Sequence, residues 1–381
     1  MRALAAACCL LLNSPLLAGP ALDSLPGAAA VPRVPRPLAL SVPGRPGLSQ
    51  AGYNALIWDG RPGDWYEWWY YKAVLPGTGQ AFYFCYGVVN PGDTAQASAA
   101  SRSYVSAGNF GEGETAEQAF PVSAFSASAS STFVRVGRNS ATDKALKGVM
   151  PLPGGGQASW DLKVEKDWGF NAMGWTMYPQ GLSNIYWYPA QASAYMTGEV
   201  SWNGRTYRLD RVPAYQDRNW GRSFPKWWTW LVSNNFRGAP GAALAAGGGE
   251  PKVIGGMSLP NAMGIGFRYG GREYAFRLGS GDYIKLDVNY GKWEVRAANG
   301  RGERIEISAY APAEKFLLLK FMAPQGREFY DYEALLGTIR VKLYSGRKLI
   351  ADLESDEGGI EFGSGSPQEF HRLFGAKVPL R

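Results

Sequence analysis

Acidic side chains beside indole rings are the residues of this chain best suited to chemistry. Four tryptophans fall within eleven positions of the segment QDRNWGRSFPKWWTWLVSNNF (216–236): Trp220, Trp227, Trp228 and Trp230. Asp217 lies at the start of this segment, and Glu67 opens a second aromatic run, EWWYYKAVL. A carboxylic acid in an apolar cavity resists ionisation, so it can stay protonated near neutral pH and deliver a proton.

An acid of this kind favours one class of reaction. A protonated carboxyl adds its proton to an electron-rich alkene and leaves a tertiary carbocation. Tryptophan faces stabilise such a cation by about 0.5–2 kcal/mol per ring and present no nucleophile that would trap it. Closure by a nearby hydroxyl then gives cyclisation, whereas closure by water gives hydration. Neither reaction requires a metal, a nucleotide or a histidine.

Other interpretations of the same residues remain open from the sequence. Asp217 precedes Asn-Trp-Gly, where an aspartate commonly forms an Asx turn. Glu67 is equally explained as a satisfied hydrogen-bond acceptor, and tryptophans are frequent in plain hydrophobic cores. In KWWTWLVSN (226–234), Trp228 and Trp230 share one face of a strand. Either that face lines a cavity or the strand is buried between two layers.

A single histidine, His371, limits the possible chemistry. It nearly excludes a zinc site built from histidines, and a Ser–His–Asp triad has only His371 to use. No G-x-G-x-x-G or Walker A pattern occurs, and the glycine runs at 154–156 and 247–249 are predicted to be turns. We therefore expect neither a metal nor a cofactor.

The N-terminal 50 residues differ in composition from the rest. Residues 1–21 carry Arg2 and the apolar run ALAAACCLLL, which predicts an export signal, and residues 22–50 read as a Pro/Ala-rich linker. The predicted location is periplasmic or at the cell envelope, associated with a membrane; a plastid transit peptide is the alternative. After processing only Cys85 remains, and its FYFCYG setting predicts a buried strand thiol.

From Gly52 onward, apolar and polar residues alternate as in β-strands. Hairpins are predicted across PGTGQ (76–80), Gly270-Gly271, the Asn/Gly turn near 300 and Ser345-Gly346. EWWYYKAVL aligns with KWWTWLVSN at an offset of 226 − 67 = 159 residues, which indicates two related β units. We expect an all-β fold with two domains, 51–210 and 211–381, and few short helices. SPQEFHRLF near the C-terminus is the best helix candidate.

Several stretches resemble the tocopherol cyclase family: GYNALIWDGRPGDWYEWWYYKAVLPGTGQAFYFCYGVVNP, YMTGEVSWNGRTYRLDRVPAYQDRNWGRSFPKWWTWLVSNNFRGAPGAALAAGGG, KWEVRAANGRGERIEISAYAP and ADLESDEGGIEFG. Together they reach over about residues 50–365, and NWGRSFPKWWTW is the most specific block. The resemblance implies a cofactor-independent enzyme that cyclises prenylated quinols to chromanols. It also implies two tandem lipocalin-like antiparallel β-barrel or sandwich halves, a fold shared with the carotenoid hydratases.

The resemblance further implies roles for individual residues. Asp217 stands where plant members carry an acid before N-W-G, and it is the predicted proton donor. Glu67 matches a glutamate of the family strand, and either a tyrosine or Glu67 is the predicted helper that accepts the phenolic proton. The residues predicted to bind substrate are Trp69, Tyr71, Trp220, Trp228, Trp230 and Asn234. Trp68 replaces a small family residue, which predicts a narrower pocket or a repacked strand.

The first hypothesis is a tocopherol-cyclase-like intramolecular lyase, of the isomerase class, acting on a prenylated quinol or related isoprenoid. A non-catalytic isoprenoid carrier and a hydratase of a polyene end are the alternatives on the same fold, and a sugar-stacking platform is a weaker one. A net charge of +7 with scattered basic residues suits a membrane surface as partner. Neither nucleic acid nor an obligate protein partner is expected.

Overall fold

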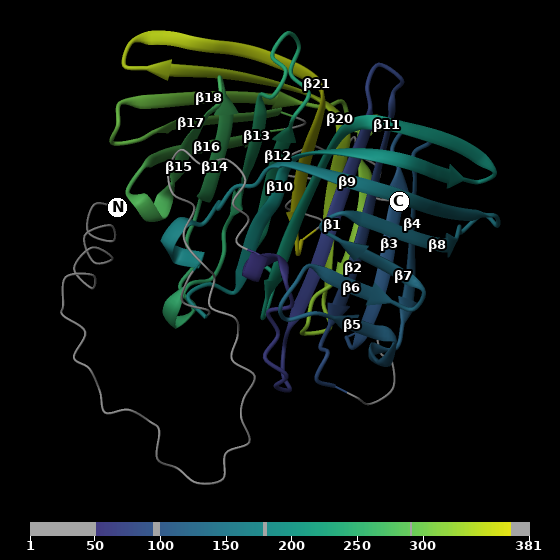
Figure 1. Ribbon diagram of the computed structural model, residues 1–381. Helices are drawn as coiled ribbons and strands as arrows, with labels where there is room; N and C mark the ends of the chain where they lie inside the picture. Colours follow the sequence, from purple (N-terminus) through teal and green to yellow (C-terminus); the bar gives the residue numbers. More distant parts are fainter. Residues whose placement is uncertain (1–50, 94–99, 178–180, 290–291, 367–381) are drawn as a thin grey trace. The chain divides into compact units, whose positions relative to one another are not determined.

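The computed structural model describes residues 51–93, 100–177, 181–289 and 292–366 (Figure 1). These residues form an all-β fold of two curled antiparallel sheets, as expected for tandem lipocalin-like halves. Within them every helix is a single 3₁₀ turn: η1 (Ala51–Asn54), η2 (Val122–Ala124), η3 (Gly174–Met177), η4 (Ile254–Gly256), η5 (Leu278–Ser280) and η6 (Ala313–Lys315).

The first sheet is formed by the strands that come first along the chain. These are β1 (Tyr66–Leu75), β2 (Gln80–Val89), β3 (Arg102–Asn109), β4 (Glu114–Phe120), β5 (Phe125–Ala127), β6 (Phe133–Val136), β7 (Asn139–Thr142), β8 (Ala145–Pro151), β9 (Gln157–Trp168), β10 (Ile185–Trp202) and β11 (Arg205–Gly221). Their order across the sheet is β4-β3-β2-β1-β11-β10-β9-β8-β7-β6-β5. Strand β1 therefore lies centrally, paired with β2 on one side and β11 on the other.

The second sheet contains the remaining strands. These are β12 (Trp227–Ser233), β13 (Ala243–Gly249), β14 (Ala262–Tyr269), β15 (Arg272–Arg277), β16 (Tyr283–Asn289), β17 (Lys292–Ala298), β18 (Glu303–Tyr310), β19 (Leu317–Met322), β20 (Glu328–Ser345) and β21 (Lys348–Ser364). Their order is β15-β14-β13-β12-β21-β20-β18-β17-β16, with β19 paired to β20. The change of sheet falls between Gly221 and Trp227, later in the chain than the predicted division at 210/211.

The four predicted hairpins are confirmed as β1–β2, β14–β15, β17–β18 and β20–β21. The glycine run at 154–156 lies in a turn, as predicted, but the prediction for 247–249 is wrong because these glycines end strand β13. A Cβ at Gly247 would lie 2.9 Å from ring carbons of Trp187, so glycine there allows an indole of the first half to approach the second sheet.

The internal repeat is present in the topology. In each sheet the first strand pairs with the second strand of the half and with its last, β1 with β2 and β11, and β12 with β13 and β21. The faces, however, match at an offset of 160 residues, so Trp68 corresponds to Trp228 and Tyr70 to Trp230. A shift of one residue along a strand exchanges its two faces. The predicted offset of 159 therefore aligns residues that lie on opposite faces.

The hydrophobic core has three main layers. One fills the curl of the first sheet and includes Trp69 and Tyr71, and another fills the curl of the second sheet and includes Leu231. The third layer contains Trp68, Tyr215, Trp228 and Trp230 and draws residues from both sheets. Because β1, β11, β12 and β21 alternate their side chains, each contributes to its own curl and to this shared layer. We call the third layer the inter-sheet layer.

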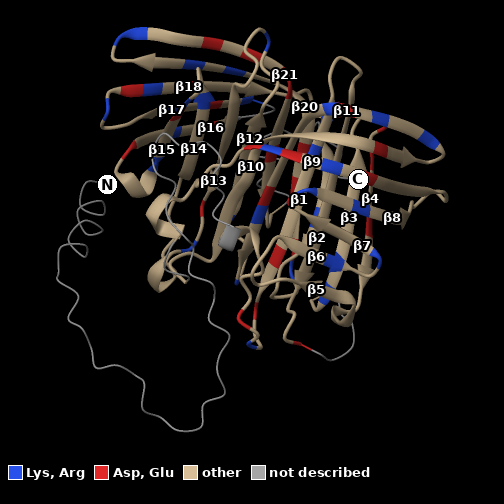
Figure 2. Ribbon diagram, viewed as in Figure 1, with Lys and Arg blue, Asp and Glu red and all other residues tan. Residues whose placement is uncertain are grey.

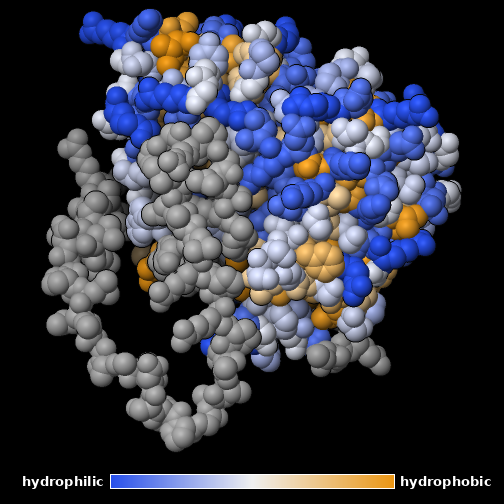
Figure 3. Space-filling view, in the orientation of Figure 1, coloured by the Kyte–Doolittle hydropathy of each residue, from blue (hydrophilic) through white to orange (hydrophobic). Residues whose placement is uncertain are grey.

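The surface of the described residues carries mixed charge. Lys and Arg are interspersed with Asp and Glu along the strands (Figure 2), and hydrophilic residues predominate on the face shown in Figure 3. No helix in the described ranges has the length and apolar character to cross a membrane. The predicted export signal, the linker, the C-terminal helix candidate and His371 lie outside the described residues. Cys85 is a buried, unpaired thiol of β2, as predicted.

Candidate functional site

Asp217 points from the C-terminal part of β11 into the inter-sheet layer. It stands opposite Tyr70 of β1, on the face of β11 that also carries Tyr215. Only 4% of its surface is exposed. Trp187 Nε1 donates to its Oδ2 at 2.8 Å and Tyr215 OH donates to the same oxygen at 2.9 Å, whereas Oδ1 has no hydrogen-bond partner among the described residues. The acid that the sequence singled out is thus a buried carboxyl with one free oxygen.

The hydrogen bonds fix which oxygen of Asp217 carries a proton. An indole N–H can only donate, and Trp230 Nε1 donates to Tyr215 OH at 3.1 Å. Tyr215 therefore directs its own proton at Asp217 Oδ2. With two donors on Oδ2, the proton of the neutral acid sits on Oδ1, the oxygen left without a partner.

Burial keeps this acid close to neutral. Desolvation raises the pKa of Asp217 to about 7, against the lowering effect of the hydrogen bonds from Trp187 and Tyr215. The neighbouring Arg218 projects to the opposite face of β11 and is not among the charges that act on Asp217. A substantial fraction of Asp217 is therefore protonated at neutral pH, as proton donation requires.

Three carboxyls of the second sheet face the same layer. Asp331 and Glu333 lie on β20 and are buried, and Glu361 lies beside Glu333 on β21 and is half-buried. Tyr70 OH donates to Glu333 Oε1, and Trp228 Nε1 donates to Asp331 Oδ1 at 3.2 Å. Glu333 Oε2 has no hydrogen-bond partner in the described part of the chain.

These carboxyls also hold protons more tightly than exposed acids do. Burial raises the pKa of Asp331 to about 7, and burial and the charge of Asp331 raise the pKa of Glu333 to about 8. Burial, followed by the charges of Asp331 and Glu333, raises the pKa of Glu361 well above its ordinary value. A hydrogen bond joins Asp331 to Glu361, and two carboxyls can form such a bond only by sharing a proton.

Lys72 is the cation of this cluster. It lies two residues beyond Tyr70 on the same face of β1, and only 3% of its surface is exposed. Its Nζ donates to the backbone oxygen of Glu357 at 3.3 Å. Burial lowers the pKa of Lys72 to about 8, against the opposing effects of Glu333 and Glu357. Its charge acts on Glu333 and lowers the pKa of that carboxyl.

Aromatic rings surround the acids. Tyr70 meets Trp230 edge-on, with ring centroids 5.8 Å apart, and Tyr215 meets Trp230 in the same way at 5.3 Å. Trp68 and Trp228 lie 6.1 Å apart, and Phe321 stacks on Trp68 at 5.5 Å. Aromatic residues of β1 and β12 therefore meet where they share the inter-sheet face. Their π faces suit a transient cation.

The layer is not closed to solvent near the acids. Tyr70, Trp187 and Glu361 are each partly exposed, although β1, β10 and β21 are interior strands of their sheets. The opposite face of β1 is covered by the core of the first curl, so the exposed surface of Tyr70 faces the inter-sheet side. The two free carboxyl oxygens, Asp217 Oδ1 and Glu333 Oε2, are themselves buried.

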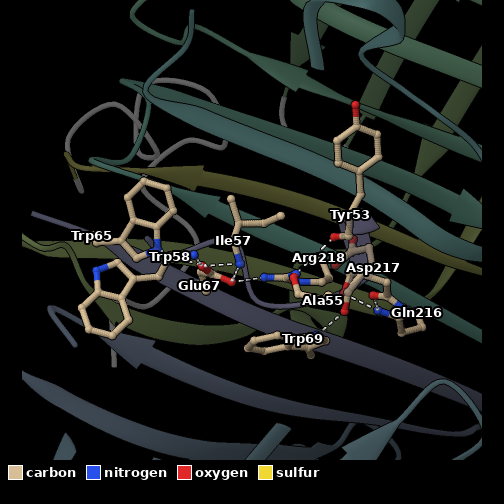
Figure 4. A network of polar contacts seen from close by, with 11 residues as sticks. Tyr53, Ala55, Ile57, Trp58, Trp65, Glu67, Trp69, Gln216, Asp217 and Arg218 are labelled. Atoms are coloured by element: carbon tan, nitrogen blue, oxygen red, sulfur yellow. Dashed lines mark hydrogen bonds and ion pairs between the residues drawn. The ribbon is translucent and has the colours of Figure 1, made fainter. Parts of the chain in front are cut away.

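Glu67 lies on the other face of β1 and does not stand beside Asp217 (Figure 4). It is fully buried and paired with Arg218, which also donates to the backbone oxygens of Tyr53 and Ala55. Glu67 accepts from Ile57 N at 3.0 Å and from Trp65 Nε1 at 2.9 Å. This is the satisfied acceptor that the sequence left open as the alternative, and it ties residues 53–58 to the first sheet.

The predicted substrate-binding residues divide by face. Trp228 and Trp230 lie in the inter-sheet layer with Asp217. Trp69 and Tyr71 belong to the core of the first curl, and Trp220 packs against Tyr186 in a separate cluster. Asn234 Nδ2 donates to the backbone oxygens of Ala214 at 2.9 Å and Ala194 at 3.1 Å, so it joins the two halves.

Sequence reasoning missed Asp331, Glu333 and Glu361. Their signal is two short patterns, FYDYEALL and GGIEFG, in which acids occupy alternate positions of otherwise apolar strands. An acid at such a position points into a buried layer. The residues that it contacts there come from distant parts of the sequence, so its neighbours along the chain do not reveal its role. In the described part of the chain no group of three or more His, Cys, Asp or Glu residues is arranged to hold a metal ion.

Comparisons with known proteins agree with the earlier resemblance. A probable chloroplastic tocopherol cyclase of Oryza sativa subsp. japonica is 24% identical over 394 residues, which cover 87% of this chain and 80% of the rice protein. A chloroplastic tocopherol cyclase of Zea mays is 29% identical over 188 residues, covering 47% of this chain and 39% of the maize protein.

Among solved structures, that of CghA with Sch210972 is similar with a TM-score of 0.51 and 11% identity, covering 87% of this chain and 97% of CghA. This likeness concerns the fold alone. The family model described as tocopherol cyclase-like matches residues 140–364, which is more than half of the sequence. The chain therefore belongs to the tocopherol cyclase-like family.

Proposed function

We propose that this protein cyclises a prenylated quinol to a chromanol, with Asp217 as the proton donor. The observation that carries the proposal is the geometry of Asp217: two donors hold Oδ2, while Oδ1 is free, buried and faces an aromatic layer. Membership of the tocopherol cyclase-like family supports the same reaction class. The rice and maize relatives are named as tocopherol cyclases, and the prenylated quinol is the substrate class that the family resemblance implies.

The reaction starts when Asp217 Oδ1 gives its proton to the alkene carbon nearest the ring. The π electrons form the new C–H bond, the O–H bond of the acid breaks, and the positive charge remains on the tertiary carbon. Trp230 and Trp228 lie in the same layer, and their ring faces stabilise this cation. The quinol oxygen then forms the C–O bond of the new ring and releases its own proton.

Asp217 is suited to donation because its conjugate base is also supported. Trp187 and Tyr215 keep their hydrogen bonds to Oδ2 after the proton leaves, so the carboxylate formed is not left bare in an apolar layer. The pKa of about 7 places the acid near the working pH, where a general acid is most effective.

Location and partners belong to the same proposal. A prenylated quinol partitions into lipid, so we infer that the protein takes its substrate from a membrane surface. Both plant relatives are described as chloroplastic, which favours the plastid interpretation of the N-terminal segment over export.

The test is incubation of the purified protein with a set of prenylated quinols and with a linear carotenoid precursor, followed by chromatography and mass spectrometry. Cyclisation gives a product of unchanged mass and shifted retention, whereas hydration adds one water. Asp217→Asn is expected to reduce turnover by at least about 10²-fold, in the range for loss of a general acid. Asp161→Asn, an exposed aspartate of β9, is the matched control and should leave turnover unchanged.

Binding that quenches tryptophan fluorescence without any product would favour the carrier instead. A product one water heavier from the polyene would favour the hydratase. Activity of Asp217→Asn equal to that of the native protein would remove Asp217 from the mechanism.

A further inference from the structure

A second carboxyl with a free oxygen faces Asp217 from the other half of the protein. Glu333 is only 1% exposed, accepts a hydrogen bond from Tyr70 at Oε1, and has no partner at Oε2 among the described residues. Tyr70 is also the cross-strand neighbour of Asp217. The two free carboxyl oxygens of the layer therefore lie on either side of one partly exposed tyrosine.

The surroundings of the two acids differ in charge. Lys72 acts on Glu333 and favours its carboxylate, whereas Asp217 has no cation among the groups that act on it. Asp331 and Glu361 are joined by a hydrogen bond in which one of the two carboxyls donates the proton. The titratable groups that interact with the cluster come from several strands: Tyr70, Lys72, Tyr83, Cys85, Tyr215, Asp217, Asp331, Glu357 and Glu361.

Ring closure also requires a base. The quinol oxygen loses its proton as the C–O bond forms, and the Asp217 carboxylate that remains after donation is already held at Oδ2 by Trp187 and Tyr215. A second buried carboxylate with a free oxygen in the same layer offers a separate acceptor for the hydroxyl proton, which lets the acid and the base be different groups. Glu67 is paired with Arg218 on the far face of β1, so it does not fill this role.

We propose that Glu333 is the catalytic base that takes the proton of the quinol hydroxyl through Oε2. This inference rests on the proposed cyclisation. The O–H bond of the quinol breaks, its electron pair forms the C–O bond to the tertiary carbon, and the proton passes to Glu333. Tyr70 holds Oε1 by its hydroxyl and so aims Oε2 at the substrate.

The proton balance closes within the site. Cyclisation is an isomerisation, so the proton that Glu333 gains equals the proton that Asp217 loses. Return of one proton from Glu333 to Asp217, directly or through the hydroxyl of Tyr70 between them, restores the starting state. No oxidant, metal or nucleotide is required for this cycle.

The pH dependence of turnover tests the assignment. Asp217 must be protonated, and its protonated fraction falls as pH rises through its pKa of about 7. Glu333 must be ionised, and its ionised fraction falls as pH drops through its pKa of about 8. The native protein should show a bell-shaped profile, with a maximum between about pH 7 and 8 at which only a minority of molecules carries both required forms.

The experiment measures kcat from pH 5 to 9 for the native protein and for Glu333→Gln, with geranyl-methylhydroquinone as the probe substrate. The variant should lose about 10²-fold in kcat at the optimum and should lose the acid limb, keeping only the alkaline limb set by Asp217. Because Asp217 still protonates the alkene, a larger fraction of the variant's product should be the hydrated compound, one water heavier.

Glu328→Gln is the matched control. It lies on the same strand and accepts from Tyr330 OH at 2.6 Å, but both residues of this pair face solvent, so kcat and its pH profile should not change. Thermal unfolding by circular dichroism verifies that each variant is folded. Should Glu333→Gln fail to fold, Tyr70→Phe serves instead: it should lower kcat while both limbs persist, with the acid limb displaced.

The outcomes separate this inference from the proposed function. A native protein that forms cyclised product, together with a folded Glu333→Gln that keeps both limbs and native kcat, overturns the base assignment alone. A native protein that binds the probe but forms no cyclised product overturns both. Loss of the acid limb in Glu333→Gln alone, or its displacement in Tyr70→Phe, supports Glu333 as the base.

Discussion

At the position of Asp217, chemistry and stability make opposite demands. Burial raises its pKa to about 7 in the folded protein, whereas an unfolded chain gives aspartate its ordinary value of 3.8. Between these values the folded state binds the extra proton, so the stability of the native protein falls as pH rises from about 4 to about 7 and stays low above that.

Asp217→Asn should therefore be stabilising at alkaline pH. The amide oxygen keeps the hydrogen bonds from Trp187 and Tyr215, and the desolvated charge is gone. The free energy of unfolding of the variant should exceed that of the native protein by up to about 4 kcal/mol at pH 8.5, and the difference should vanish near pH 4. Urea unfolding at a series of pH values measures it, and a difference independent of pH would show that Asp217 is not a buried neutral acid.

Glu67 illustrates the contrasting case of a buried charge with a partner. Glu67→Ala leaves the Arg218 guanidinium buried without its carboxylate and should lower the free energy of unfolding by about 3–5 kcal/mol. Lys147→Ala removes a partner of the exposed pair with Asp161 and should change it by less than about 0.5 kcal/mol. Equal effects in the two denaturation curves would contradict the anchoring role of Glu67.

Individual residues also show how much of the site could be predicted from the sequence. Asp217 was recognisable because its aromatic neighbours follow it closely along the chain. Glu333 and Glu361 were not, because their partners lie far away in the sequence: the packing of the two halves brings Tyr70 to Glu333, and strand pairing within the second sheet brings Trp230 to Glu361. Local sequence also left open whether Glu67 faces a site or a core.

At the scale of elements, glycine spacing on β21 makes room for the indoles of β12. Gly359, Glu361 and Gly363 share the inter-sheet face. A Cβ added at Gly359 would lie 2.4 Å from Cζ3 of Trp230, and one at Gly363 would lie 2.5 Å from Nε1 of Trp228. The alternation of glycine and acid thus lets both tryptophans lie flat against the strand that carries Glu361.

Gly359→Ala should therefore displace the Trp230 ring and weaken its hydrogen bond to Tyr215. We expect a loss of about 1–3 kcal/mol in the free energy of unfolding, as for other overpacked cores, and a shifted tryptophan emission. Gly300→Ala, in a turn where an added Cβ meets open space, is the control and should change neither. If Gly359→Ala matched the control in both measurements, the close fit of Trp230 against β21 would be refuted.

Strands and hairpins were predictable because their signals are local. Alternating apolar residues and Gly-rich turns located β1–β2, β14–β15, β17–β18 and β20–β21. The glycines that end β13 were predicted to be a turn. The neighbouring sequence does not show that Trp187 of the first half packs closely against Gly247. The offset of the repeat was wrong by one residue because similarity of letters does not record which face a residue occupies.

At the scale of the whole molecule, the repeated topology explains where the site lies. Tyr70 pairs with Asp217 in the first sheet, and Trp230 pairs with Glu361 in the second, at equivalent positions of the repeated topology. Each half thus presents an acid beside an aromatic residue on its inter-sheet face. Glu333, the proposed base, is the cross-strand neighbour of Glu361, and its surroundings differ from those of Asp217, which is the condition for different roles in acid–base chemistry.

The incorporation of solvent deuterium tests the central claim, proton donation from Asp217 to an alkene, most directly. The native protein in D₂O should convert a prenylated quinol into a chromanol that carries one non-exchangeable deuterium on the carbon next to the new ether carbon. Asp217→Asn, folded and able to bind the same quinol, should form no labelled product. Labelled chromanol from that variant at the native rate, or unlabelled chromanol from the native protein, would contradict the account.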